Sequence, residues 1–293
     1  MVAEVLSVIA PVFLIAALGY VWARLDKPFD SAMVTQLTVA VTTPCLIVDT
    51  FLRASISMEA FGRMVAATLV LYALMALLGF TSLLLLRWRQ SHFLPSLIFG
   101  NTGNMGLPLC LFAFGEEGLA LGITLFAVST ILNFTLGPSI AAGSISPKQI
   151  LRMPILYAVV GAVTILITGL RPPHWLGETI HLLGGVTIPM MILALGVSLA
   201  RLKIVGLGRA LVLTSIRIGG GMVLAFPVAW LFEVEGAARG VLIVQAAMPA
   251  AVFNFLFAER YSSAGSDVAG VVLVSSLVSV ATTPALLWFL LPA

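Results

Sequence analysis

Ten long apolar runs dominate this 293-residue chain and limit the folds it can adopt. The chain is 60% hydrophobic and only 9% charged, whereas a soluble domain carries roughly 25% charged residues. An apolar run of about 20 residues crosses a bilayer as a helix, because a helix pairs its own backbone polar groups. We therefore predict an all-α integral membrane protein with ten transmembrane helices. The expected spans are 4–23, 31–50, 62–86, 93–114, 118–139, 151–170, 177–200, 207–232, 238–258 and 267–291.

Short motifs recur along the chain at a nearly constant offset. Val41–Pro44 in the second run resembles Val186–Pro189 in the seventh, 145 residues later. Val128–Ile131 resembles Val274–Leu277 at an offset of 146. A unit of five spans is odd-numbered, so a second copy enters the membrane from the opposite side, as in many transporters. We predict two inverted five-helix repeats, residues 1–145 and 146–293.

Lysine and arginine are distributed unequally between the two sets of alternating loops. The loops after odd-numbered spans hold ten: Arg24, Lys27, Arg87, Arg89, Lys148, Arg152, Arg201, Lys203, Arg209 and Arg260. The opposite loops hold four: Arg53, Arg63, Arg171 and Arg239. This bias places the odd-numbered loops in the cytoplasm and both termini on the external side of the cytoplasmic membrane. Basic residues scattered at helix ends form no patch suited to nucleic acid.

Two of the apolar runs are interrupted by residues that weaken a helix. The fourth run contains Gly100–Pro108, with three Gly, two Asn, a Thr and a Pro in nine residues, and the ninth contains Met248–Asn254. Broken backbone at membrane depth survives only against protein or a water-filled cavity. Paired breaks in two halves of a chain point to a transporter's substrate site. The expected substrate-binding residues are Asn101, Thr102, Asn104, Pro108, Gln245, Pro249 and Asn254, with Thr42 and Thr43 nearby.

Charge and proline inside the spans are the other unusual features. Pro44 and Pro189 occupy matching places, where each is expected to kink its helix. Asp49 is the deepest carboxylate, and Arg217 falls near the middle of the eighth run. A charge at that depth costs roughly 2.5–3.5 kcal/mol and needs a partner or a wet cavity. Arg217 could therefore attract an anionic substrate or form a structural ion pair.

Signatures of enzymes and of cofactor binding are absent from the sequence. There is no P-loop, no HExxH motif, no Ser/His/Asp arrangement at membrane depth and no Cys/His cluster with metal-ligand spacing. We expect no enzymatic activity, no cofactor and no metal site. No pair of buried carboxylates suggests a proton relay, and coupling to protons or sodium stays open.

The two broken segments resemble those of the auxin efflux carriers, the plant PIN-type carriers and their bacterial relatives. The family pattern Asn-Thr-x-x-Met-Gly-[Ile/Leu]-Pro is similar to Asn101–Pro108. The pattern of the ninth span is similar to Met248–Tyr261. The identical positions there are Pro249, Phe255, Phe257, Ala258 and Tyr261.

This resemblance implies a ten-helix secondary carrier in which helices 4 and 9 cross at their breaks. It implies a scaffold of helices 1, 2, 6 and 7 facing a transport domain of helices 3–5 and 8–10. It also implies organic-anion substrates, dimerisation through the scaffold, and a fold similar to that of the bile-acid sodium symporters.

The chain departs from the plant pattern at several places. Gly100 stands where the plant carriers have Pro. Ala250, Ala251 and Asn254 replace their Gln, Gly and second Pro. An acidic and basic pair early in the third span corresponds here to Thr68 and Tyr72, and the long cytoplasmic loop is reduced to about 141–150.

The sequence therefore predicts an elevator-type transporter of a small organic anion, such as a carboxylate or an auxin-like acid. Two alternatives remain at this point. One is a sodium-coupled symporter of the bile-acid type, and the other is a non-transporting membrane receptor or scaffold.

Overall fold

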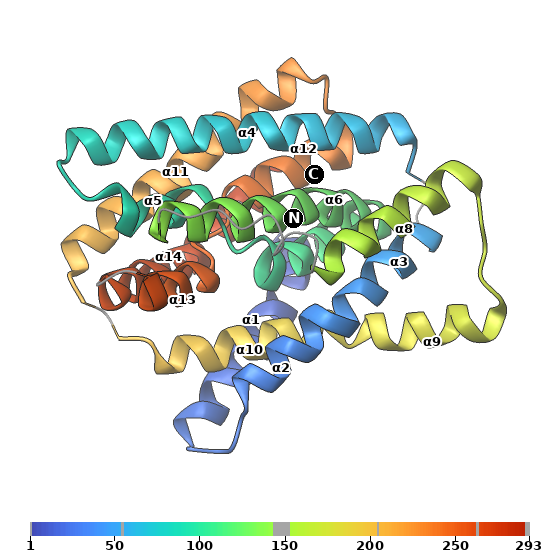
Figure 1. Ribbon diagram of the computed structural model, residues 1–293, viewed down its shortest axis with the longest axis horizontal. Helices are drawn as coiled ribbons and strands as arrows, with labels where there is room; N and C mark the ends of the chain where they lie inside the picture. Colours follow the sequence, from blue (N-terminus) through green and yellow to red (C-terminus); the bar gives the residue numbers. More distant parts are fainter. Residues whose placement is uncertain (1, 54–55, 143–152, 204, 262–263, 291–293) are drawn as a thin grey trace.

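The computed structural model describes residues 2–53, 56–142, 153–203, 205–261 and 264–290 (Figure 1). These residues form helices and no strand apart from one isolated bridge. The prediction of an all-helical membrane protein is therefore confirmed for the described part of the chain. The expected junction of the repeats at 145–146 lies outside it, as do Lys148, Arg152 and the side chain of Arg260 from the count of basic residues.

The helices follow one another with short connections. The first half contains α1 (Val2–Arg24), α2 (Ser31–Leu37), the π-helical segment η1 (Thr38–Thr42), α3 (Thr43–Arg53), α4 (Met58–Leu85), α5 (Gln90–Ile98), the π-helical segment η2 (Thr102–Gly106) and α6 (Leu107–Ala142). The second half contains α8 (Pro154–Thr168), α9 (His174–Gly185), α10 (Thr187–Arg201), α11 (Leu207–Leu231), α12 (Gly236–Ala246), α13 (Val252–Tyr261) and α14 (Gly265–Leu290).

Seven helical segments among the described residues are long and apolar enough to cross a membrane, and α8 and α12 are apolar but shorter. The fourth expected run is divided among α5, η2 and the start of α6, and the ninth is divided between α12 and α13. α6 then turns a corner at Gly115, where φ is 65°, and continues through the fifth run. A φ of this sign suits glycine, which has no Cβ. The count of ten spans and their inverted repeat stay predictions.

Both expected proline kinks coincide with an interruption of regular helix. α3 begins at Thr43 directly after η1, so Pro44 is its second residue. α10 begins at Thr187 after α9 has ended at Gly185, so Pro189 is its third residue. Proline has no N–H to donate, so it disturbs the regular hydrogen-bond pattern of the turn before it. The helical path nevertheless continues through both places, over Ser31–Arg53 and His174–Arg201.

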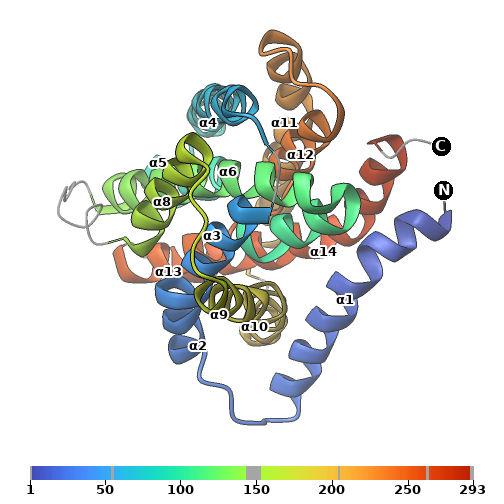
Figure 2. The same cartoon turned by 90° about the vertical axis from the view of Figure 1, so that its right-hand side faces the viewer.

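Two groups of helices pack against each other. In one group α1 lies against α10, and α3 lies against α8 and α9. In the other group α11 contacts α4, α12 and α14, while α6 contacts α4, α5 and α12. Both views place α4 near the top of the molecule and α2, α9 and α10 in its lower half (Figures 1 and 2).

Most of the apolar side chains with no solvent exposure belong to the second group, although Ile47 of α3 and Ile192 of α10 are buried as completely. Leu97 of α5, Leu109 of α6, Leu242 of α12 and Val272 of α14 have no solvent exposure. The ends of α5 and α12 are therefore surrounded by protein at the centre of the molecule, where broken backbone must find its partners within the chain.

Candidate functional site

The two broken segments meet and pair with each other through their backbones. Gly100 and Ala250 form an isolated antiparallel bridge. The Asn101 N–H donates to the Pro249 carbonyl at 2.7 Å, and the Ala251 N–H donates to the Phe99 carbonyl at 3.1 Å. Each break thus satisfies polar groups that the other leaves without an intrahelical partner.

Two side chains complete the pairing at this crossing. Asn254 Nδ2 donates to the Phe99 carbonyl at 2.9 Å, so that this buried oxygen accepts two hydrogen bonds. The Ala250 N–H donates to Ser275 Oγ at 3.1 Å. Unpaired backbone is costly away from water. These two side chains therefore help to make the broken helices tolerable at membrane depth.

A cavity of about 130 Å³ lies on one side of the crossing. A single water needs only roughly 10–15 Å³ on such a measure, so the cavity can hold several waters or a small organic molecule. The polar residues that line it are Thr35, Thr38, Thr43, Asn101, Thr102, Asn104, Ser129, Thr130 and Asn133. Apolar residues, among them Phe126, Phe134, Met191 and Phe253, form the rest of its wall. None of the described residues that line it is charged.

Two helix N-termini face this cavity. η2, which continues into α6, begins at Thr102, and α13 begins at Val252. Asn101 and Ala251, the residues directly before these starts, both line the cavity. A helix N-terminus carries partial positive charge and N–H groups directed outward. The electrostatic environment of the cavity therefore favours an anion.

Several polar side chains around the cavity have unused hydrogen-bonding capacity. Asn101 Nδ2 and Asn133 Oδ1 are buried and have no partner. Thr102 Oγ1 lies 3.4 Å from Ser129 Oγ, and Ser129 Oγ lies 2.6 Å from Tyr72 Oη. Buried polar atoms without partners are uncommon in proteins and invite a ligand or water. The cavity thus offers both a donor and an acceptor to an incoming molecule.

The structure divides the residues expected at the site into two sets. Those that line the cavity are Asn101, Thr102, Asn104 and Thr43. Those that do not line the cavity are Pro108, Gln245, Pro249, Asn254 and Thr42, all of them buried. Gln245 Nε2 instead lies 3.5 Å from Cys110 Sγ. The broken segments are therefore brought together as expected, but only part of each faces the cavity.

Sequence reasoning missed five polar residues of the cavity wall, which are Thr35, Thr38, Ser129, Thr130 and Asn133. One signal was present, because Ser129 and Thr130 lie within one of the repeated motifs. Asn133 also stands in an otherwise apolar run, where an amide is unusual. The threonines of α2 and η1 carry no such signal.

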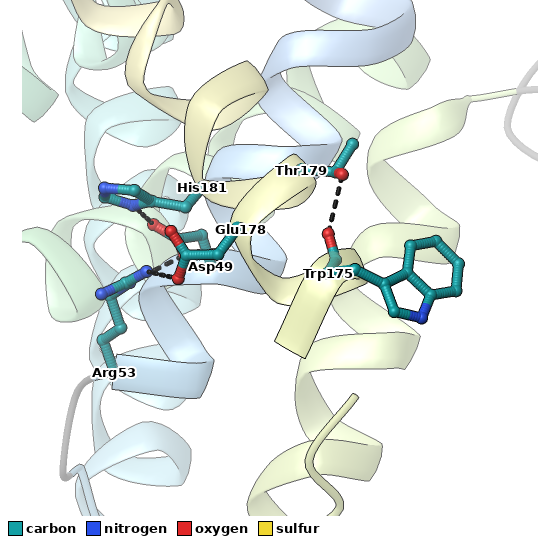
Figure 3. A network of polar contacts seen from close by, with 6 residues as sticks. All are labelled: Asp49, Arg53, Trp175, Glu178, Thr179 and His181. Atoms are coloured by element: carbon teal, nitrogen blue, oxygen red, sulfur yellow. Dashed lines mark hydrogen bonds and ion pairs between the residues drawn. The ribbon is translucent and has the colours of Figure 1, made fainter. Parts of the chain in front are cut away.

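Asp49 does not face the cavity. It lies on α3 and forms an ion pair with Arg53, whose Nε is 2.9 Å from its Oδ1 (Figure 3). His181 of α9 reaches its other oxygen, with Nδ1 2.9 Å from Oδ2. Arg53 also approaches Glu178 of α9 at 3.9 Å. This network joins α3 to α9, so the position of Asp49 indicates a structural role.

Arg217 lies on α11, on the side of the crossing away from the cavity. Only 2% of the residue is exposed. Its Nη1 donates to the carbonyl of Ala246, the last residue of α12, at 3.1 Å. None of the described carboxylates forms an ion pair with it. The structural ion pair considered from the sequence is therefore not found among the described residues, and Arg217 bonds the end of α12 instead.

Comparison with known proteins identifies the family. A family model described as membrane transport protein matches residues 4–287. The chain belongs to the membrane transport protein family. The resemblance to the auxin efflux carriers that the two broken segments indicated is thereby confirmed. This member of the family is a multi-pass membrane transporter.

Three relatives of this transporter carry informative descriptions. A putative malonate transporter from Rhizobium meliloti (strain 1021) is 25% identical over 325 aligned positions, which cover 98% of this chain and 96% of that protein. An uncharacterised transporter from Methanocaldococcus jannaschii is 27% identical over 201 residues, or 65% of this chain and 63% of that protein.

The third relative, an uncharacterised transporter from Methanothermobacter thermautotrophicus, is 24% identical over 194 residues, or 64% of this chain and 63% of that protein. The chain thus spans slightly less than two thirds of the length of each archaeal relative. Its match to the rhizobial relative extends over nearly the whole of both proteins.

Proposed function

We propose that this transporter carries a small organic anion, and that the anion binds in the cavity beside the crossing of the broken helices. The observation that carries the proposal is the pair of helix N-termini that face an uncharged cavity holding unpartnered polar atoms. The substrate site then comprises Asn101, Thr102, Asn104 and Thr43 together with Ser129, Thr130 and Asn133.

The donors of the cavity suit a carboxylate better than a cation. Asn101 Nδ2 and the hydroxyls of Thr102 and Ser129 can donate to carboxylate oxygens. A cation would require carboxylates or convergent carbonyls, and the described lining contains no carboxylate. Asn133 Oδ1 can accept from a hydroxyl or from a protonated second carboxyl group. The description of the rhizobial relative makes malonate a suitable first probe.

Alternating access by an elevator-type movement belongs to the same proposal. The cavity lies between the two groups of helices, because Thr38 and Met191 come from the group of α1–α3 and α8–α10, while Asn101 and Ser129 come from the other. Sliding of one group along the other would carry the anion and the crossing helices together. The group with α1, α3, α8, α9 and α10 would serve as the scaffold and as the surface of a homodimer in the cytoplasmic membrane.

The test is counterflow of radiolabelled malonate in proteoliposomes, with acetate, succinate and an indole-type acid as competitors. Asn101→Ala and Asn133→Ala each remove one amide from the cavity. A hydrogen bond to a charged group contributes about 1.5–3 kcal/mol and a neutral one about 0.5–1.5 kcal/mol. We therefore expect roughly ten-fold weaker apparent affinity or more for Asn101→Ala and a smaller loss, of about two- to ten-fold, for Asn133→Ala.

The matched control is Gln36→Ala, which removes an exposed amide on α2 outside the cavity wall. It should leave affinity unchanged. Unaltered counterflow in folded Asn101→Ala and Asn133→Ala would contradict the site. Tight binding of an anion without counterflow would favour a receptor, and counterflow that requires sodium would favour the symporter alternative.

A further inference from the structure

Arg217 is a buried cation that the substrate cavity does not use. Its guanidinium lies beside the crossing in a small space of about 10 Å³, lined also by Tyr72, Ile98, Gln245 and Ala246. Nη1 bonds the Ala246 carbonyl, and Nε has no partner. Such a group needs a reason to lie at this depth, because a charge in the membrane is costly.

The negative ends of two half-helices converge on this guanidinium. α5 ends at Ile98 and α12 ends at Ala246, and both residues line the same small space as Arg217. The last carbonyls of a helix carry a partial negative charge and lack intrahelical donors. In other broken-helix transporters such ends are where a coupling cation binds. Here a protein side chain occupies the equivalent electrostatic position.

The backbone around Arg217 is shaped to admit the guanidinium. A Cβ at Gly100 would overlap Arg217 Nη2, and a Cβ at Gly221 would overlap the Ala246 carbonyl oxygen and lie 3.2 Å from Arg217 Nη1. Gly100 is also the position at which the chain departs from the proline of the plant pattern. The guanidinium of Arg217 therefore fits its site only because residues 100 and 221 are glycines.

Arg217 does not line the cavity, so any effect that it has on substrate binding is transmitted by the paired breaks. Tyr72 lies between them, since it lines the small space beside Arg217 and its hydroxyl bonds Ser129 of the cavity wall. The Tyr72 ring also stacks on Phe99, with centroids 5.7 Å apart. Arg217 is thus a positioning residue for the paired breaks and not a ligand of the substrate.

We infer that the Arg217 guanidinium is a built-in counter-charge for the C-terminal ends of α5 and α12, in the place where a bound metal cation would otherwise stand. Substrate binding should then need no sodium. The expectation that substrate binding needs no sodium rests on the proposed function. The stabilisation of the ends of α5 and α12 by Arg217 does not depend on it.

The first test compares wild type with Arg217→Ala, which deletes the guanidinium and leaves room for a small cation. Thermal denaturation of the purified proteins is followed with millimolar guanidinium chloride, urea, sodium chloride or choline chloride. We expect a lower denaturation temperature for Arg217→Ala that guanidinium raises toward wild type and that urea, of similar shape but neutral, does not. The matched control is Arg63→Ala, whose exposed side chain should leave no guanidinium response.

A second comparison keeps the test decisive if Arg217→Ala does not fold. Arg217→Lys retains the charge, whereas Arg217→Met retains the apolar stem alone, so the lysine variant should be the more stable of the two. Equal stability of these variants, or rescue of Arg217→Ala by urea as well as by guanidinium, would overturn the inference.

Wild-type malonate counterflow in sodium and in choline medium separates this inference from the proposed function. Equal rates support both. Counterflow that sodium accelerates several-fold overturns the role of Arg217 while the proposed function stands. If no anion shows counterflow but guanidinium still stabilises Arg217→Ala, the proposed function is contradicted. The role of Arg217 as a counter-charge is then still supported.

Discussion

At the scale of single residues, the side-chain amides of Asn101 and Asn254 have different surroundings. Asn101 lines the cavity with its Nδ2 unpartnered, whereas Asn254 uses its Nδ2 to bond the Phe99 carbonyl. Both stand in broken segments, and both have the same functional group. Under the proposed function, Asn101 therefore binds the substrate, whereas Asn254 supports the backbone of the crossing.

This division predicts different effects for the same substitution at the two sites. Asn254→Ala should lower the free energy of unfolding by about 0.5–1.5 kcal/mol, because it removes one of the two hydrogen bonds to the buried Phe99 carbonyl. Its effect on anion affinity should be smaller than that of Asn101→Ala. Thermal denaturation and malonate binding, measured on both variants, check this. A variant Asn254→Ala of wild-type stability with abolished binding would reverse the assignment.

The sequence predicted Asn101 and Asn104 because they interrupt an apolar run together with Gly and Pro. For Ser129 and Thr130, which lie within α6, the repeated motif was the only signal, and it did not assign them to the cavity. Hydroxyls on membrane helices commonly bond the carbonyl four residues earlier, as Thr124 does with Ala120. Such residues look the same in sequence whether they face a ligand or their own helix.

At the scale of helices, two packing contacts can be compared with the inverted repeat, which stays a prediction from the sequence. In that repeat the first span corresponds to the sixth, and the second to the seventh. α1 packs on α10 of the seventh run, and α8, from the sixth, packs on α3 of the second. Exchanging the two halves of the chain would turn the contact of α1 with α10 into the contact of α8 with α3. The same exchange would relate the Asn101–Pro249 hydrogen bond to the Ala251–Phe99 hydrogen bond.

Helix boundaries near the breaks followed from composition, whereas η1 had little local signal. The apolar runs defined where helices lie, and Gly, Asn and Pro marked where two of them stop. The π-helical segment η1 contains no Gly, Asn or Pro, since Thr38–Thr42 reads Thr-Val-Ala-Val-Thr, and only Pro44 just beyond it signals an irregularity. The bend of α6 at Gly115 agrees with the expected boundary between the fourth run, which ends at 114, and the fifth, which begins at 118.

The close approach of α1 to α10 depends on two glycines. A Cβ at Gly196 would overlap the Ala16 carbonyl oxygen, and a Cβ at Gly19 would overlap the Leu193 carbonyl oxygen. Small residues let membrane helices approach through their backbones. Gly196→Ala should therefore lower thermal stability, by separating α1 from α10.

Gly219→Ala in α11 makes the same chemical change where no atom lies within 4 Å of the added carbon. It should be neutral or slightly stabilising, because alanine favours a helix more than glycine does. Denaturation of both variants in the same detergent compares them directly. Equal temperatures would show that α1 and α10 do not need the close contact.

At the scale of the whole molecule, contacts between loops support the expected topology. Arg209 at the start of α11 pairs with Asp267 of α14 at 3.0 Å and lies 5.5 Å from the ring centroid of Trp88. All three belong to loops expected on the cytoplasmic side. At the other face Arg63 of α4 donates to the Glu233 carbonyl at 3.3 Å. No contact among these joins loops assigned to opposite sides.

These contacts and the excess of basic residues predict how single cysteines will react from outside the cell. In a background with Cys45 and Cys110 replaced by alanine, Glu235→Cys lies between α11 and α12, and Arg89→Cys lies between α4 and α5. A membrane-impermeant maleimide should modify Glu235→Cys in intact spheroplasts and Arg89→Cys only after permeabilisation.

The reverse labelling pattern would show that the protein has the opposite orientation in the membrane, with the same topology. Labelling of both sites from one side would contradict the path of the chain itself, because α5, the paired breaks and α12 connect these two loops through the centre of the molecule.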